Sequence, residues 1–271
     1  MSPIKSILQK PAFHNGIIRA KKLWYRGRGE PIQYGAYKLR YVPGTRPVRL
    51  KYVDSSDVVA RNDAKQIDFF LKRVQQGQFM LDIGGNVGQY AVLFSALVGP
   101  AGKVITFEPD QLHRIILHRN VELNRCSDRV IIEGLALSDT NGTHLFFSRN
   151  DQMSSLVRTG LGTNATAPDV KQQIVATARL DDYIKVKKLG LADWVKIDTE
   201  GAEINILRGA GEHLRSNAVI VCELHPYAWK ELGTSYEELL GLIKDSGRNI
   251  RYLDQTQRIE NGPVHGCVII S

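Results

Sequence analysis

Short strand-like segments alternate with segments of helical periodicity from residue 79 onward, and this alternation constrains the fold more than any other feature of the chain. The first pair is an apolar strand over 79–85 and an apolar helix over 88–98. Further strands are expected over 103–110, 129–137, 194–198, 217–225, 249–254 and 266–271, and further helices over 111–124, 202–215 and from Ser235 onward. Such repeats favour a parallel sheet with helices on both faces. The sequence therefore predicts an α/β fold for residues 79–271.

The turn between the first strand and the first helix reads DIGGNVG over 82–88. Glycines at this position let the backbone approach a ligand at a helix N-terminus. A dinucleotide-binding fingerprint, G-x-G-x-x-G, would need a glycine where this chain has Ile83. The turn therefore indicates a ligand other than NAD.

Two acids indicate which ligand the turn could bind. Asp82 ends the first strand, where its carboxylate can accept hydrogen bonds from an amino group of a cationic ligand, directly or through water. Glu108 ends the second strand, where it can accept from both hydroxyls of a ribose. Hydrogen bonds to charged groups contribute about 1.5–3 kcal/mol each. S-adenosylmethionine fits this pair, because it has an ammonium group, a sulfonium and a ribose but no phosphate.

Several segments occur in one order and spacing: LDIGGNVGQY, FEPD, NVELN, LALSD, LDDY, VKIDTEGAEINILRGA and CELH. With them, residues 79–225 resemble the FkbM family of class I methyltransferases. The resemblance implies a Rossmann-like, seven-stranded and mostly parallel sheet whose last strand is antiparallel. It also implies O-methyl transfer from S-adenosylmethionine, often to a sugar hydroxyl.

The resemblance also implies which residues bind the donor. The methionine end would be held by Asp82, Gly84, Asn86 and Gly88, the ribose by Glu108, and the adenine would be flanked by Gly134, Leu135 and Ala136. Gly85 belongs to the same glycine turn. The family commonly has alanine at this position, and this conservative departure does not weaken the resemblance.

Two charged residues lie in the strand over 194–198, which is otherwise flanked by apolar residues. The period of a strand places Lys196 and Asp198 on one face. Ligands of open α/β sheets bind beyond the carboxyl ends of the strands, where Asp198, Glu200, Glu223 and His225 are expected. Transfer of a methyl group to an alcohol needs a base within hydrogen-bond reach. Asp198, Lys196, Glu200, Glu223 and His225 are therefore the candidate catalytic residues.

Structural explanations remain open for several of these residues. Acids are favoured at the start of any helix, which alone would account for Glu200 and Glu203. Lys196 and Asp198 could form an ion pair without a catalytic role, although burying two charges has a desolvation cost. His225 could be an ordinary loop residue. No ligand spacing compels a metal, although Asp198, Glu200 and Glu223 could gather one, and we expect none.

The connection over 138–179 is long for a compact domain, and such loops are usually functional or disordered. Asn141-Gly142 predicts a hairpin between the segments LALSD and THLFF. The pair Ser154-Ser155 lies in this connection and is a candidate contact to donor or acceptor. The helix over 111–124 is expected to bury Leu112, Ile115, Ile116 and Leu123 and to leave His113 and His118 in solvent.

Residues 1–78 form a basic extension to the methyltransferase domain expected over 79–271. Residues 1–53 contain twelve of the 36 Lys/Arg, and Glu30 is their one acid. A hairpin is expected within 38–53 and a basic helix within 13–30. The extension could contact a membrane surface or a lipid-linked substrate, or form a lid or dimer element. Nucleic acid is a less favoured partner, because the cations lie outside the core and no RNA-binding module is recognisable.

The cysteines, Cys126, Cys222 and Cys267, form no CxxC pair, which argues against a disulfide framework or a zinc module. No apolar run reaches eighteen residues, and residues 1–16 lack a signal-peptide pattern. These features predict a soluble cytoplasmic protein, with peripheral association at the inner face of the membrane as an alternative.

The leading functional hypothesis is S-adenosylmethionine-dependent O-methylation of a sugar hydroxyl in a glycan, glycolipid or glycosylated natural product. An RNA 2′-O-methyltransferase is one alternative, since lysine, aspartate and glutamate also serve that chemistry. A non-catalytic module that binds S-adenosylmethionine is another. A homodimer is compatible with each.

Overall fold

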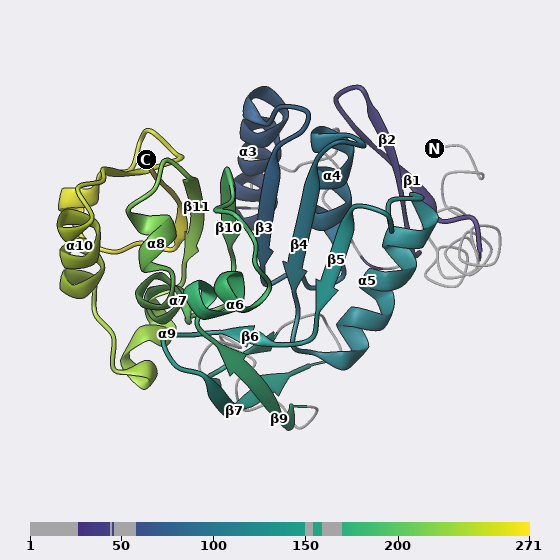
Figure 1. Ribbon diagram of the computed structural model, residues 1–271. Helices are drawn as coiled ribbons and strands as arrows, with labels where there is room; N and C mark the ends of the chain where they lie inside the picture. Colours follow the sequence, from purple (N-terminus) through teal and green to yellow (C-terminus); the bar gives the residue numbers. More distant parts are fainter. Residues whose placement is uncertain (1–26, 44, 46–57, 150–153, 159–169) are drawn as a thin grey trace, which may run out of the picture.

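The computed structural model describes residues 27–43, 45, 58–149, 154–158 and 170–271. Its central sheet has seven strands in the order β12-β13-β11-β10-β3-β4-β5 (Figure 1). Their bounds are β3 Phe79–Ile83, β4 Lys103–Phe107, β5 Val130–Glu133, β10 Trp194–Ile197, β11 Val219–Leu224, β12 Ile250–Tyr252 and β13 Gly266–Ile270. Strand β13 is antiparallel to both of its neighbours, and the other pairs are parallel. The predicted seven-stranded α/β fold with an antiparallel last strand is confirmed.

Helices cover both faces of this sheet because its strands are apolar on both sides (Figure 1). One face packs against α3 Val58–Arg73, α4 Gln89–Val98 and α5 Gln111–Leu123. The other packs against α6 Leu180–Val186, α7 Glu203–Gly209, α8 Gly211–Leu214 and α10 Tyr236–Asp245. The remaining helical turns are α9 Pro226–Trp229, η3 Lys230–Leu232 and η4 Ile259–Asn261.

Strand alternation decides which face each charged residue reaches. Met80 and Trp194 belong to the core on the α3 and α4 side, whereas Leu81 and Val195 belong to the opposite core. Lys196 therefore points toward α3 and α4, two positions after Trp194 in the same strand. Charged side chains on this face of the sheet therefore lie on the side of α3.

A second sheet lies across the carboxyl ends of the central strands (Figure 1). It contains β6 Ala136–Leu137, β7 Gly142–Ser148, β8 Ser154–Ser155 and β9 Lys171–Ala178, in the order β6-β9-β7-β8. The hairpin expected at Asn141-Gly142 is wrong, because β9 lies between β6 and β7 and pairs with both. Asn141 instead accepts from the amide of Arg179 at 2.9 Å and donates to Asp182 at 2.7 Å. Its side chain ties the turn to the end of β9.

The described part of the N-terminal extension packs on the same core. Strands β1 Glu30–Tyr34 and β2 Tyr37–Tyr41 form an antiparallel hairpin. This hairpin occupies 30–41 and turns at Gly35-Ala36, whereas one was predicted within 38–53, and most of 44–53 lies outside the described residues. Most of the helix predicted within 13–30 lies outside the described residues, and helix α3 was not predicted. Tyr34 and Tyr41 are buried against α4, with the Tyr41 hydroxyl donating to the Gln89 carbonyl at 3.0 Å.

Helix α5 turns a different face to the core than its apolar residues predicted. Leu112 and Ile115 are 50% and 59% exposed, whereas Leu117 is fully buried. His113 is also buried, so its predicted exposure is wrong, while His118 is exposed as expected. The N-cap Asp110 accepts from the His113 amide at 2.9 Å and fixes the rotation of the helix over the glycine turn.

Among the described segments, none of the helices combines the length and the apolar character that a membrane crossing needs.

Candidate donor cavity and charged cluster

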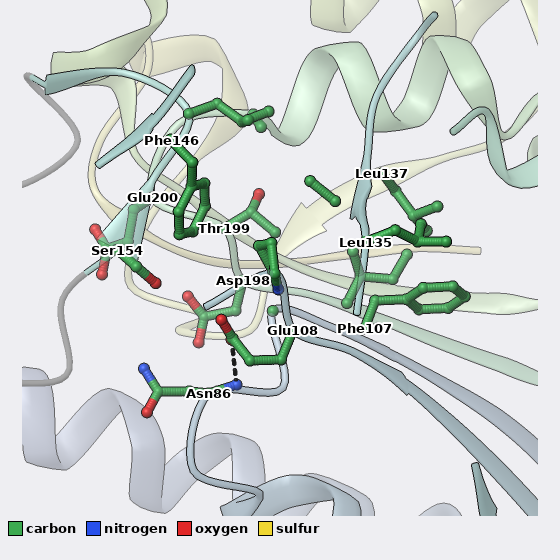
Figure 2. Close-up of a pocket in the computed structure, with 16 residues that line it drawn as sticks. Asn86, Phe107, Glu108, Leu135, Leu137, Phe146, Ser154, Asp198, Thr199 and Glu200 are labelled. Atoms are coloured by element: carbon green, nitrogen blue, oxygen red, sulfur yellow. Dashed lines mark hydrogen bonds between the residues drawn. The ribbon is translucent and has the colours of Figure 1, made fainter. Parts of the chain in front are cut away.

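A cavity opens beyond the carboxyl ends of β3, β4 and β10 (Figure 2) and encloses about 630 Å³ including its mouth. Its described lining consists of Ile83, Gly84, Asn86, Phe107, Glu108, Pro109, Leu135, Ala136, Leu137, Phe146, Ser154, Leu156, Asp198, Thr199, Glu200 and Ala202. Five of the nine predicted donor-binding residues belong to this lining: Gly84, Asn86, Glu108, Leu135 and Ala136. The other four, Asp82, Gly85, Gly88 and Gly134, lie outside it.

The glycine turn forms the floor of the cavity and is packed too closely for side chains. Gly84 has a φ of 86°, and a β carbon there would overlap the carbonyl oxygen of Asp198. A β carbon on Gly85 would collide with the hydroxyl of Thr106. The amides of both glycines donate to the Phe107 carbonyl, at 3.0 and 2.9 Å. An alanine at position 85 would therefore have to displace the Thr106 hydroxyl or shift the turn.

Glu108 is held rigidly at the cavity wall. Its Oε2 accepts from the backbone amide of Asn86 at 2.7 Å (Figure 2). Its Oε1 accepts from the backbone amide of Asp110 at 2.7 Å. Burial raises the pKa of Glu108 to about 8, although these two amide hydrogen bonds lower it. A carboxyl group fixed in this way presents its remaining lone pairs to the cavity, which suits the two hydroxyls of a ribose.

Asp82 lies beneath the turn and is fully buried. Its Oδ2 accepts from the Thr106 hydroxyl at 3.0 Å, while its Oδ1 has no hydrogen-bond partner among the described residues. Burial raises the pKa of Asp82, and the neighbouring Lys196 opposes this effect. In this geometry Asp82 supports the turn from below rather than lining the cavity.

Lys196 and Asp198 form a pair on one face of β10, as predicted from strand periodicity. Lys196 Nζ lies 3.1 Å from Asp198 Oδ2 and 4.3 Å from the centre of the Tyr90 ring. Burial lowers the pKa of Lys196, but the charges of Asp198, Asp82 and Glu223 outweigh this effect and raise it overall. Lys196 thus stays positively charged. Of the two residues, Asp198 is the one that lines the cavity.

Glu203 does far more than begin a helix. It is fully buried, and its Oε1 accepts from the Gly201 amide at 2.7 Å and from His225 Nδ1 at 2.9 Å. Its Oε2 accepts from the indole nitrogen of Trp229 at 2.8 Å. Glu203 therefore fixes the orientation of the His225 ring, a role that its position at a helix start concealed.

The other ring nitrogen of His225, Nε2, lies 3.4 Å from Glu200 Oε2. Burial lowers the pKa of His225, but Glu200 and Glu203 outweigh it and raise the pKa to about 10. With both ring nitrogens protonated at neutral pH, His225 cannot accept a proton. Glu200 lies in the left-handed backbone region with a φ of 54°, a conformation that non-glycine residues hold at a cost and that clusters at functional sites.

Glu223 links α3 and the chain before β13 to a charged cluster, which we define as Lys196, Asp198, Glu200, Glu203, Glu223 and His225. Its Oε2 accepts from Gln66 Nε2 at 3.0 Å, and its Oε1 lies 3.2 Å from His265 Nε2. Burial raises the pKa of Glu223, but His265, His225 and Gln66 outweigh it and lower the pKa to about 2. Sequence analysis missed Gln66 and His265, because neither lies at the end of a predicted core strand.

Asp63, also on α3, was missed for the same reason. It accepts from the Tyr90 hydroxyl at 3.2 Å. Burial raises its pKa to about 7, and the charges of Glu223 and Asp198 act in the same direction.

The described residues also contain two groups of three potential metal ligands within 4.8 Å of one another: Glu223, His225 and His265, and Asp198, Glu200 and His225.

The sequence matches the family described as "Methyltransferase FkbM domain" over residues 82–250. The chain belongs to the FkbM methyltransferase family. The family predicted from the ordered motifs is thus confirmed, and so is its enzymatic class, an S-adenosylmethionine-dependent methyltransferase.

Two curated relatives of this FkbM methyltransferase are similar over most of their own length. Methyltransferase sdnD of Sordaria araneosa is 26% identical over 74% of this chain and 87% of its own. The hexuronic acid methyltransferase AglP of Haloferax volcanii is 24% identical over 61% of this chain and 63% of its own. A solved structure, described as a putative rRNA-methylase from Clostridium thermocellum, aligns with a TM-score of 0.46 and 12% identity over 75% of this chain and 89% of that one.

In this FkbM methyltransferase, the cavity and the charged cluster share two residues. Asp198 and Glu200 line the cavity, and they also contact Lys196 and His225 in the cluster. The cavity and the charged cluster therefore adjoin at these two carboxylates.

Proposed function

We propose that this FkbM methyltransferase transfers the methyl group of S-adenosylmethionine to a sugar hydroxyl of a glycan, glycolipid or glycosylated natural product. The observation that carries the proposal is that Asp198 belongs both to the cavity wall and to the charged cluster. The AglP relative is named for methylation of a hexuronic acid, which supports a carbohydrate acceptor.

The groups that line the cavity suit the chemistry of the donor. Gly84 brings its backbone to the cavity lining, and Glu108 faces the cavity with oxygens fixed by backbone amides. In this proposal Glu108 binds the ribose, Leu135 and Ala136 flank the adenine, and Asn86 and Gly84 hold the methionine end. Asp82 acts through its support of the turn. When bound, the donor supplies an electrophilic methyl group on a sulfonium.

Asp198 is the proton acceptor in this proposal. The acceptor oxygen forms a bond to the methyl carbon while the bond from that carbon to sulfur breaks, which leaves S-adenosylhomocysteine. The hydroxyl proton passes to the Asp198 carboxylate, which Lys196 holds in place at 3.1 Å. Positioning of two reactants contributes about 7–11 kcal/mol to such a transfer. His225, doubly protonated at neutral pH in the metal-free protein, balances the charge of Glu200 and Glu203 instead.

The decisive experiment compares glycan and lipid extracts from cells that lack this protein with extracts from the parent cells by mass spectrometry. We expect one or more carbohydrate species to lose a methyl group, and expression of the intact protein but not of Asp198→Asn to restore it. In parallel, purified protein should form S-adenosylhomocysteine with carbohydrate acceptors that carry uronic acids. Turnover with RNA and not with carbohydrate would refute the proposed acceptor class.

A further inference from the structure

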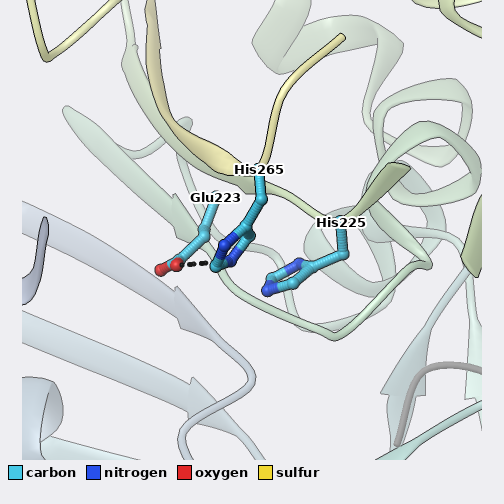
Figure 3. A group of neighbouring side chains, drawn as sticks. All are labelled: Glu223, His225 and His265. Atoms are coloured by element: carbon cyan, nitrogen blue, oxygen red, sulfur yellow. Dashed lines mark ion pairs between the residues drawn. The ribbon is translucent and has the colours of Figure 1, made fainter. Parts of the chain in front are cut away.

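Three potential metal ligands meet where the end of β11 approaches the start of β13 (Figure 3). Glu223 lies near the end of β11, His225 directly follows this strand, and His265 directly precedes β13. Glu223 Oε1 lies 3.2 Å from His265 Nε2, and one ligand atom from each of the three residues lies within 4.8 Å of the others. We propose that Glu223, His225 and His265 bind a divalent first-row transition-metal ion. The site departs from the sequence expectation of no metal, because its residues are up to 42 positions apart in the chain.

The distances fit this ligand set. Ligand atoms about 2.0–2.1 Å from a tetrahedral ion lie roughly 3.3 Å from one another. The Glu223 and His265 atoms already have this separation, and the third ligand atom must approach by at most about 1.5 Å. Two imidazoles with one carboxylate suit zinc, manganese, cobalt or iron, whereas magnesium prefers an all-oxygen site.

The surrounding residues orient the ligands in the way that metal sites require. Glu203 accepts from His225 Nδ1 at 2.9 Å and thereby leaves Nε2 as the ligand atom. Gln66 donates to Glu223 Oε2 at 3.0 Å and leaves Oε1 toward His265. A carboxylate behind a ligating histidine fixes the ring and its tautomer. The His265 side chain is 36% exposed, which gives an ion a path from solvent.

The charge around the site also favours a cation. Six carboxyl groups interact electrostatically with Lys196 or with His225: Asp63, Asp82, Asp198, Glu200, Glu203 and Glu223. Taking several like charges out of water is costly unless cations compensate them. A divalent ion bound by neutral imidazoles would replace the proton that His225 carries and add one net positive charge to this region.

The role inferred for the ion rests on the proposed O-methylation. An ion with an open coordination position acts as a Lewis acid and lowers the pKa of a bound hydroxyl. Because His225 lies 3.4 Å from Glu200, which lines the cavity, an acceptor hydroxyl bound to the ion would be close to the donor cavity. The hydroxyl proton would then pass to Asp198 as the bond to the methyl carbon forms.

The test measures metal binding without turnover. The full-length protein is stripped with a chelator, then titrated with Zn²⁺ and Mn²⁺ by calorimetry and with Co²⁺ by visible absorption. We expect one ion per chain, and a loss of affinity of at least tenfold in His265→Ala, His265→Gln and Glu223→Gln. His118→Ala, an exposed histidine on α5, is the matched control and should bind as the parent does.

Thermal unfolding and calorimetry with S-adenosylmethionine show whether each variant is folded and keeps its donor cavity. Two histidine variants are used so that misfolding of one leaves the other informative. No stoichiometric binding to the parent protein, or equal affinity in the folded His265 variants, would overturn the site. If the ion binds at this site but no carbohydrate acceptor is methylated, the proposed function fails while the metal site stands.

Discussion

The ammonium group of Lys196 lies 3.1 Å from the carboxylate of Asp198, and only the carboxylate reaches the donor cavity. This division of roles predicts different outcomes for the two substitutions. Asp198→Asn removes the proposed proton acceptor and should lower kcat by about 100- to 10,000-fold. Donor affinity should change much less, because the amide keeps the size of the side chain. Single-turnover rates and calorimetric donor affinity separate the two effects.

Lys196→Met should instead reduce stability. It leaves the buried carboxyl group of Asp82 without its neighbouring cation, and breaking a buried pair costs about 3–5 kcal/mol. Urea unfolding measures the difference from the parent. Lys188→Met, at an exposed position after α6, is the control and should stay within about 0.5 kcal/mol of the parent. Full activity in Asp198→Asn would rule out Asp198 as the base.

His213 predicts how stability depends on pH. Its ring is fully buried, its Nε2 accepts from the Ala192 amide at 3.2 Å, and burial lowers its pKa to about 4. Because His213 binds a proton more readily in the unfolded chain, its contribution to the free energy of unfolding is fully present above its unfolded pKa. It is lost as the pH falls from about 6.5 toward 4, at about 1.4 kcal/mol per pH unit at most.

His213→Gln should therefore make unfolding less sensitive to pH between 7.5 and 4.5, because glutamine can accept from the same amide and does not titrate there. Urea unfolding at several pH values gives the slope for each protein. His118→Gln, the same substitution at an exposed position on α5, serves as the control. Parallel stability curves for the parent and His213→Gln would contradict the role of this histidine.

Residues 1–26 contain six Lys/Arg and no acid, which predicts binding to anionic membranes. Each cation near such a surface contributes about 1 kcal/mol, and salt screens the attraction. Deletion should end at residue 26, because the hairpin from Glu30 to Tyr41 belongs to the core. We expect the deletion to reduce co-sedimentation with phosphatidylserine vesicles at least tenfold at low salt.

Phosphatidylcholine vesicles and a high-salt arm are the controls for this measurement, and both should remove the difference. Light scattering on the same two proteins tests the alternative role in dimerisation. Unchanged vesicle binding together with a change from dimer to monomer would favour that alternative over membrane contact.

Local sequence patterns correctly predicted the parts of this enzyme whose conformation depends on residues that are adjacent in the sequence. The strand, glycine turn and helix over 79–98 and the shared face of Lys196 and Asp198 follow from periodicity. Contacts between distant segments were not predictable in this way. Strand β9 lies between β6 and β7 because of pairing across the long connection, and α3 brings Gln66 to Glu223 from 157 residues away.

Burial of polar residues was the other source of error. Helix α5 buries His113 and Asn120 rather than Leu112 and Ile115, because hydrogen bonds decide its orientation. Asn120 donates to the Val87 carbonyl at 2.7 Å and accepts from the Val42 amide at 2.7 Å. Apolar periodicity carries no information about such partners, so it selected the wrong face.

We expect substitutions of Gly85 and Thr106, at the floor of the donor cavity, to have coupled effects on stability. A β carbon on Gly85 would collide with the Thr106 hydroxyl, which donates to Asp82 at 3.0 Å. Gly85→Ala should therefore cost about 1–3 kcal/mol of stability through overpacking and also weaken donor binding. Thr106→Ala makes room for the methyl group but leaves Asp82 Oδ2 without this donor, at a cost of about 1–3 kcal/mol.

The double variant should be more stable than the sum of the two single effects implies, by about 0.5–3 kcal/mol, because the second change removes the atom that the first one strikes. Urea unfolding and donor calorimetry on all four proteins complete the cycle. Gly190→Ala is the matched control, since a β carbon there meets no described atom within 4 Å. Strict additivity would show that the Gly85 loop accommodates alanine by moving away from Thr106, and that the hydroxyl does not select glycine at this position.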